Sequence, residues 1–151
     1  MRIAIGSDSA TELTEALTAE LIARGHELQP FGPLTRGDAG CDWPLVAAQV
    51  ARAVSEGRAD EGIVCCWTGT GVSIAANKIA GIRAALVGDA ETARGARIYN
   101  HANILALSLR ATTVTIMKEI LTAWFSTPVT EGEAQSEWNR QQIERVGELE
   151  R

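Results

Sequence analysis

The sequence has 151 residues, a formal net charge of -5 at pH 7 and a pI near 5.1. Nucleic-acid surfaces rely on clustered Lys and Arg, and a membrane span needs about 20 apolar residues in a row, so the acidic balance and the short apolar runs exclude both classes. A chain of this length buries a core without disulfides or metal, and its three cysteines match neither a disulfide framework nor a zinc site.

The chain opens with a predicted strand at residues 2–6, with no signal-peptide pattern before it, so we expect a cytoplasmic protein. Residues 7–10 form the turn that leaves this strand and offer possible N-caps for a helix. Leucines repeat at helical spacing from residue 13 and predict a helix that ends at residues 24–25. A weaker strand follows at residues 26–31, where Pro30 favours an edge position in the sheet.

A loop and a second helix come next. Residues 32–43 are rich in Gly, Asp and Pro, which is typical of a loop. Pro44 suits the first position of a helix, and valines and alanines at helical spacing extend that helix to residues 56–57.

The central segment, residues 62–85, has the order strand, glycine turn, helix. The apolar run 63–66 predicts a strand buried on both faces, as in a parallel sheet. Gly69 and Gly71 allow a sharp turn before a helix at residues 72–78. This order directs free backbone N–H groups toward the carboxyl edge of the sheet, where an anion or a developing oxyanion is stabilised.

The alternation continues in the second half of the chain. Apolar runs predict strands at residues 82–87 and 103–108, and apolar repeats at helical spacing predict helices at 92–98 and 112–125. Pro128 follows the last of these helices and prevents its continuation.

Strands that alternate with helices predict a Rossmann-like three-layer α/β/α domain with a five-stranded parallel sheet, over residues 1–128. The tail, residues 129–151, is polar and charged. Its isolated apolar residues recur at roughly helical spacing: Trp138, Ile143, Val146 and Leu149. Because they are too few to support a separate helix, we expect a C-terminal helical extension that packs on a partner subunit.

Cys66 ends the central strand directly before the glycine turn. A cysteine at the end of a buried strand is more often a small core side chain than a reactive thiol, and Cys65 on the opposite face is interpreted in that way. The position of Cys66 before a helix N-terminus favours the thiolate and therefore a base or nucleophile. These considerations alone leave both interpretations of Cys66 open.

The turn could also be a dinucleotide-binding fingerprint, with Gly69 and Gly71 as its glycines and Asp89 as the ribose-binding acid. However, Ile74 replaces the third glycine, the motif follows a middle strand, and the chain is too short to add a substrate domain. Nicotinamide binding therefore ranks below the alternatives.

Five other side chains have a functional and a structural interpretation. Asp8 could bind sugar hydroxyls or cap a helix, and Asn100 could bind a ligand or form a turn. Arg110 could hold an anion or cap a carbonyl group. Trp43 and Trp67 could stack on a ligand, although core or interface packing is commoner for tryptophan.

Residues 62–85 closely resemble the signature of the ribose-5-phosphate isomerase B and galactose-6-phosphate isomerase family, in which a strand ending in Cys leads to G-T-G-x-G-x-S-I-A-A-N-K. The resemblance extends to the opening strand with its Asp, to a D-Y-P motif, to a mid-chain helix and to an H-N-D-A-N-V-L-A-L motif. The corresponding segments here are residues 1–8, 42–44, 92–94 and 100–107. Roughly residues 1 to 126 align without large gaps.

The resemblance implies a Rossmann-like fold and a homodimer or homotetramer with active sites shared between subunits. It implies aldose–ketose isomerisation of a small sugar or sugar phosphate through a cis-enediolate, with no metal and no other cofactor. Cys66 would be the base that moves a proton between C1 and C2, and Thr68 would support the sugar oxygens. This agrees with the physical analysis, because an enediolate needs a base near neutrality and oriented N–H donors.

The resemblance also implies a substrate-binding set. Backbone amides of residues 67–71 would form the anion hole, Asp8 and Asn100 would bind hydroxyl groups, and Arg110 would reach the phosphate. The complete set of implied binding residues is Asp8, Ser9, Trp67, Gly69, Thr70, Gly71, Asn100 and Arg110.

The chain departs from the family pattern at several of these places. Ser9 replaces a histidine associated with phosphate, and Tyr99, the candidate catalytic acid, replaces a histidine associated with ring opening, although tyrosine is only a weak acid at neutral pH. Trp67 replaces a glycine and adds bulk beside the base. The family's Gly-Arg-His stretch near the C-terminus has no counterpart in residues 130–135, so Arg140 becomes the candidate replacement.

The proton-transfer half of the site is thus retained, whereas the phosphate-binding half is eroded. We expect an isomerase whose substrate differs from ribose 5-phosphate, either another sugar phosphate or a sugar with a smaller or no phosphate. Trp43 and Arg140 are the expected rim or second-subunit contacts. The alternatives are a ribose-5-phosphate isomerase with rearranged ligands and a sugar- or nucleotide-binding protein of the same fold without turnover.

Overall fold

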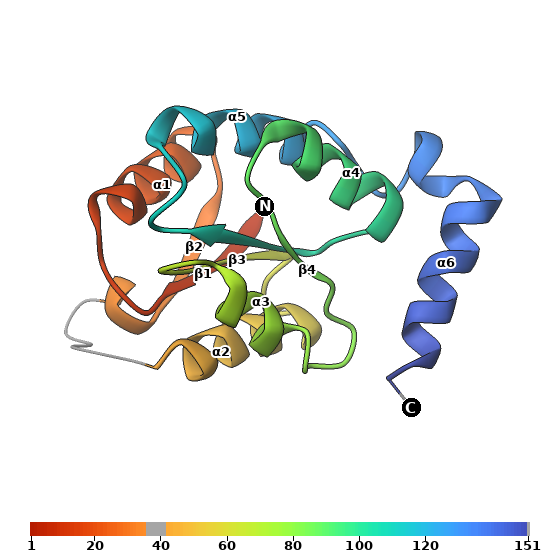
Figure 1. Cartoon of the computed structure of the whole chain (residues 1–151), viewed down its shortest axis with the longest axis horizontal. Helices are drawn as coiled ribbons and strands as arrows, with labels where there is room; N and C mark the ends of the chain where they lie inside the picture. The colour runs from red at the N-terminus through yellow and green to blue at the C-terminus, as the bar shows by residue number, and fades with distance from the viewer. Residues whose placement is uncertain (36–41, 151) are drawn as a thin grey trace.

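The computed structural model describes residues 1–35 and 42–150 and confirms the three-layer α/β/α architecture (Figure 1). Part of the expected loop at 32–43, including Cys41, lies outside the described residues. The five strands in the described part of the chain are parallel, in the order β2-β1-β3-β5-β4. The strands are β1 (Arg2–Ser7), β2 (Glu27–Phe31), β3 (Glu61–Cys66), β4 (Ala84–Leu86) and β5 (Ile104–Ser108).

The described residues form six α-helices: α1 (Glu12–Ala23), α2 (Trp43–Ser55), α3 (Thr70–Ala76), α4 (Ala90–Asn100), α5 (Val114–Phe125) and α6 (Glu137–Glu148). Short 3₁₀ turns occur at Gly32–Leu34 and Gly132–Gln135. Figure 1 shows α1, α4 and α5 on one face of the sheet and α2 and α3 on the other, with α6 at the side next to α4. Among the described residues, none of the helices has an apolar stretch of the length needed to cross a membrane.

Strand β3 lies at the centre of the sheet, and all six of its residues are buried. Its alternate side chains enter two separate apolar clusters, because successive residues of a strand point to opposite faces. Ile63 and Cys65 join the cluster under α1, α4 and α5, whereas Val64 and Cys66 join the cluster over α2 and α3. This placement confirms the expectation of a strand buried on both faces.

Three helix boundaries correct the sequence-based expectations. Helix α1 is capped by Thr11, whose side chain accepts a hydrogen bond from the Thr14 N–H in a capping box, and not by residues 7–9. Helix α4 extends beyond 92–98, so that Asn100 is its last residue and not a turn residue. Asp89 caps α4 by accepting a hydrogen bond of 2.6 Å from the Thr92 N–H, which gives this carboxylate a structural role in place of a ribose contact.

A buried ionic network ties β3 to α4 and α5. The Arg97 guanidinium lies 2.7 Å from a Glu61 carboxylate oxygen, and both residues are less than 10% exposed. Arg97 also donates to the carbonyl groups of Ala102 and Thr127, and the Trp124 indole N–H donates to Glu61 over 2.6 Å. The Arg97 guanidinium carbon lies 4.9 Å from the centre of the Trp124 ring. These bonds satisfy both buried charges, which is the condition under which a buried ion pair is tolerated.

The network generates a stability prediction. Arg97→Met leaves the Glu61 carboxylate buried without its cation, and we expect a loss of about 3–5 kcal/mol in the free energy of unfolding, measured by urea denaturation. Arg94→Met is the matched control, because Arg94 pairs with Glu91 at the surface and its loss should leave the unfolding midpoint nearly unchanged. Equal shifts for the two variants would contradict a structural role for the buried pair.

Candidate active site

The turn after β3 crosses the end of β5 at the carboxyl edge of the sheet. Gly69 has a φ of 76°, in the left-handed region, and a Cβ atom there would lie 2.9 Å from the carbonyl carbon of Leu107. Only glycine combines this backbone conformation with this close approach. The end of β5 fixes the turn further, because the Arg110 N–H and the Ser108 hydroxyl both donate to the Trp67 carbonyl over 3.0 Å.

Cys66 lies at the floor of a pocket of about 280 Å³, which we call the Cys66 pocket. Its lining residues come from the ends of β1 and β3, from the turn and from the start of α2: Asp8, Trp43, Cys66, Trp67, Thr68, Thr70 and Gly71. The structure therefore brings together most of the residues that the sequence predicted around the base. Ser9 and Gly69 do not line the pocket. Gly69 acts through the shape of the turn.

Asp8 has an unsatisfied acceptor beside the thiol. Its Oδ1 atom is buried and has no hydrogen-bond partner among the described residues. A buried carboxylate oxygen without a donor is costly unless a ligand supplies one. Asp8 is therefore available to accept a hydrogen bond from a bound hydroxyl group, and its alternative role as a helix cap is wrong because Thr11 caps α1.

A second pocket of about 300 Å³, the Arg110 pocket, adjoins the first. Thr68 lines both pockets, and its hydroxyl lies 2.7 Å from the Thr70 hydroxyl. Arg110 is exposed and is the cationic member of the described lining of the second pocket. A ligand that reaches across Thr68 would thus meet the thiol and Asp8 at one end and a guanidinium group at the other.

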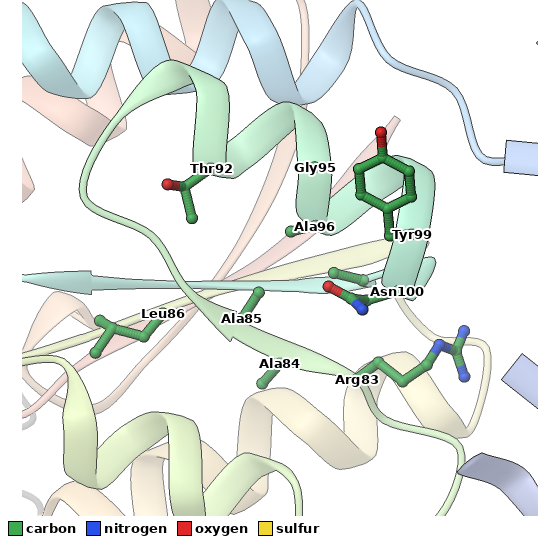
Figure 2. Close-up of a pocket in the computed structure, with 10 residues that line it drawn as sticks. Arg83, Ala84, Ala85, Leu86, Thr92, Gly95, Ala96, Tyr99 and Asn100 are labelled. Atoms are coloured by element: carbon green, nitrogen blue, oxygen red, sulfur yellow. The ribbon is translucent and has the colours of Figure 1, made fainter. Parts of the chain in front are cut away.

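Tyr99 and Asn100 are not part of the Cys66 pocket. They line a third pocket of about 420 Å³ between α4 and β4, the Asn100 pocket, which shares no lining residue with the Cys66 pocket. In Figure 2 the Asn100 side chain projects from the end of α4 toward this pocket, whereas the Tyr99 hydroxyl points away from β4. That hydroxyl lies 3.3 Å from a Glu133 carboxylate oxygen.

Helix direction explains this separation. A helix between two parallel strands runs back from the carboxyl edge of the sheet to the amino edge, so the last residues of α4 lie near the start of β5. Cys66 lies at the opposite edge. Arg140, on α6, is exposed and lines none of these three pockets. Within one chain, the structure therefore separates Tyr99, Asn100 and Arg140 from Cys66.

The two adjacent thiols have different surroundings. Cys65 is fully buried, and burial raises the pKa of its thiol to about 12. Cys66 lines a pocket, although only 5% of its surface is exposed. In the described part of the chain, His, Cys, Asp and Glu side chains do not gather in threes in a way that would hold a metal ion.

Comparison with known proteins places the chain among sugar isomerases. A family model described as Ribose/Galactose Isomerase matches residues 3–141. Ribose-5-phosphate isomerase B of Escherichia coli is 37% identical over 150 residues, which cover 99% of this chain and 96% of that protein. The D-erythrulose-4-phosphate isomerase of Pectobacterium atrosepticum is 34% identical, covering 97% and 93%. The solved structure of Clostridium thermocellum ribose-5-phosphate isomerase B has a TM-score of 0.88 at 38% identity and covers 99% and 97%.

The surroundings of the two thiols predict unequal reactivity in the folded protein. In a Cys41→Ser background at pH 8, we expect a thiol reagent to modify Cys66 well before Cys65, as judged by peptide mass analysis. A thiol with a pKa of about 12 remains protonated up to about pH 10 and is not nucleophilic. Cys65→Ala should keep the labelling and Cys66→Ala should abolish it. Labelling of Cys65 in the native state at the rate seen for Cys66 would contradict the assignment.

Proposed function

Since the chain belongs to the ribose/galactose isomerase family, we propose that it interconverts the aldose and ketose forms of a sugar phosphate. The observation that carries this proposal is the Cys66 pocket, where a thiol, an unpartnered carboxylate oxygen and the N–H groups of a glycine turn converge. This is the set of groups that an enediolate reaction requires.

In the proposed mechanism the Cys66 thiolate removes the proton from C2 of the open-chain aldose. The electrons of the broken C–H bond form the C1–C2 double bond, and the carbonyl oxygen at C1 becomes the enediolate oxygen. The thiol then returns the proton to C1. The hydroxyl proton on the C2 oxygen passes to the C1 oxygen, so that C1 carries a hydroxyl group and the C2 oxygen becomes the ketose carbonyl. The reaction as written needs no cofactor.

Two sets of groups act on that intermediate: backbone N–H groups stabilise its negative charge, and Asp8 orients the sugar. The first α-helical bond of α3 runs from the Ser73 N–H to the Gly69 carbonyl, so the N–H groups of residues 70–72 have no acceptor within the helix. In the proposed mechanism these donors stabilise the negative charge that develops on the enediolate oxygen. Asp8 holds a sugar hydroxyl through its free Oδ1 atom.

Recognition of the phosphate is assigned to Arg110. The Arg110 pocket adjoins the Cys66 pocket at Thr68, so an extended sugar phosphate spans the two. Ser9 lines neither pocket and offers no charge in place of a cationic side chain. The relatives differ in the sugar for which they are named, a ribose phosphate or an erythrulose phosphate. Because Ser9 stands where the family pattern has a histidine, the substrate as proposed is a sugar phosphate other than ribose 5-phosphate.

The active site as proposed is completed by a second copy of the chain. Asn100 and Tyr99 of the partner subunit reach the Cys66 pocket across a dimer interface, with Arg140 at its rim. Exposed apolar side chains support such an interface, since Ile74 on α3 is 60% exposed and Trp138 on α6 is 63% exposed. Residues 129–151 serve as the interface extension in this assembly.

The proposed location of the enzyme is the cytoplasm. Cys65 and Cys66 are both free thiols, the state that cytoplasmic reductants maintain. A reduced thiol at Cys66 is also what the proposed base requires.

The mechanism predicts proton exchange with solvent that depends on Cys66. The protein is incubated in D2O with a panel of tetrose, pentose and hexose phosphates and the corresponding free sugars. We expect deuterium to enter C1 or C2 of at least one sugar, and proton NMR measures this exchange. Cys66→Ala should slow this exchange by about 10²–10⁴-fold, and Cys65→Ala, the adjacent buried thiol, should keep it. Exchange with none of the sugars, from a folded protein, would favour a sugar-binding protein without turnover.

A shared active site predicts complementation between inactive variants. Cys66→Ala and Asn100→Ala, refolded together in equal amounts, should regain about a quarter of the wild-type activity, because half of the dimers are mixed and each mixed dimer has one intact site. The control mixes Cys66→Ala with Asp8→Ala, which affect the same pocket of the same chain and should regain nothing. Mixed dimers without activity in the first pair would contradict the shared site.

A further inference from the structure

Two indole rings lie at the rim of the Cys66 pocket. Trp67 is 65% exposed and Trp43 is 42% exposed, and both line the pocket. By contrast, Trp124 is 1% exposed and donates its indole N–H to Glu61. Large aromatic side chains that remain exposed beside a concave polar site are typical of ligand contacts, because water solvates their rings poorly.

The chain holds the backbone of Trp67 and the ring of Trp43 in position. The Trp67 carbonyl accepts hydrogen bonds from the Arg110 N–H and the Ser108 hydroxyl, so the backbone that carries the ring is fixed at the end of β5. The Trp43 ring packs against Gly71, where an added Cβ atom would lie 3.0 Å from Trp43 Cε3. Preorganised aromatic surfaces bind with a small loss of conformational entropy.

The ionisable residues that line the Cys66 pocket indicate which part of the substrate lies beside the two indole rings. The described lining contains one ionisable carboxylate, Asp8, and no Lys, Arg or His. The cationic lining residue Arg110 belongs to the adjoining pocket, which shares Thr68 with the Cys66 pocket. With the phosphate assigned to the Arg110 pocket, the part of the substrate inside the Cys66 pocket is the carbon skeleton next to the thiol.

We propose that Trp67 is a specificity-determining residue that stacks on the C–H face of the sugar carbons beside Cys66, with Trp43 bounding the same pocket. This inference rests on the proposed isomerase function and extends it to substrate recognition. Affinity then comes largely from the carbon skeleton, so the site accepts free sugars as well as their phosphates. Trp67 also covers the reacting carbons from water, which limits the escape of protons from the enediolate.

The test separates binding from turnover by using the Cys66→Ala protein. Titration calorimetry with ribose and ribose 5-phosphate, and with erythrulose and erythrulose 4-phosphate, gives a Kd for each probe sugar. We expect Trp67→Ala to raise the Kd of both members of a pair by about tenfold and Trp67→Phe, which keeps a ring, by less than about threefold. Ile22→Ala removes a side chain that is 59% exposed on α1, and it should leave every Kd unchanged.

Other outcomes overturn the stacking role. An unchanged Kd in Trp67→Ala, or no measurable binding of any probe sugar to the Cys66→Ala protein, would exclude it. A change confined to the oligomeric state of Trp67→Ala, measured by light scattering, would instead make Trp67 an interface residue. If only the isomerase function fails, the result is different. The Cys66→Ala protein then binds a sugar in a way that depends on Trp67, but the protein that retains Cys66 shows no deuterium exchange.

Discussion

At Gly69 the backbone passes the end of β5 with a φ of 76° and with 2.9 Å between the site of an absent Cβ and the Leu107 carbonyl carbon. This close crossing sets the direction of the turn after β3 and of α3. Only three residues separate Cys66 from the first residue of α3, and one of them, Thr68, lines both the Cys66 pocket and the Arg110 pocket. The hydrogen bonds from Ser108 and Arg110 to the Trp67 carbonyl hold the same crossing from the β5 side.

The fold could be predicted from the sequence because its signals are local. Apart from β2, each strand contains a short apolar run. Pro30 correctly placed β2 at an edge of the sheet, since proline cannot donate to a neighbouring strand. The errors fall at element ends. Thr11 caps α1 through a reciprocal bond with Thr14. The prediction was wrong because serine is also a favourable N-cap, so residues 7–9 were chosen instead. The Glu61–Arg97 pair was missed because its two residues belong to different elements and neither disturbs the local pattern.

The candidate site could be predicted only where its residues follow strand ends. Asp8, Cys66 and Thr68 lie at the carboxyl edge and meet in one region, as parallel topology requires. Asn100 precedes a strand, so its place at the amino edge follows from the direction of α4, a constraint that a motif match does not contain. Recognising that constraint in the sequence would have separated Tyr99 and Asn100 from Cys66 within one chain.

The buried Glu61–Arg97 network lies at the start of β3, at the other end of that strand from Cys66. The groups that hold the layers together and the groups that surround the thiol therefore occupy opposite edges of one sheet. Mutations at the carboxyl edge can therefore change ligand binding while the buried Glu61–Arg97 ion pair stays intact. Because of this division, substitutions at rim residues such as Trp67 can change which sugar is bound while the free energy of unfolding supplied by the buried network is kept.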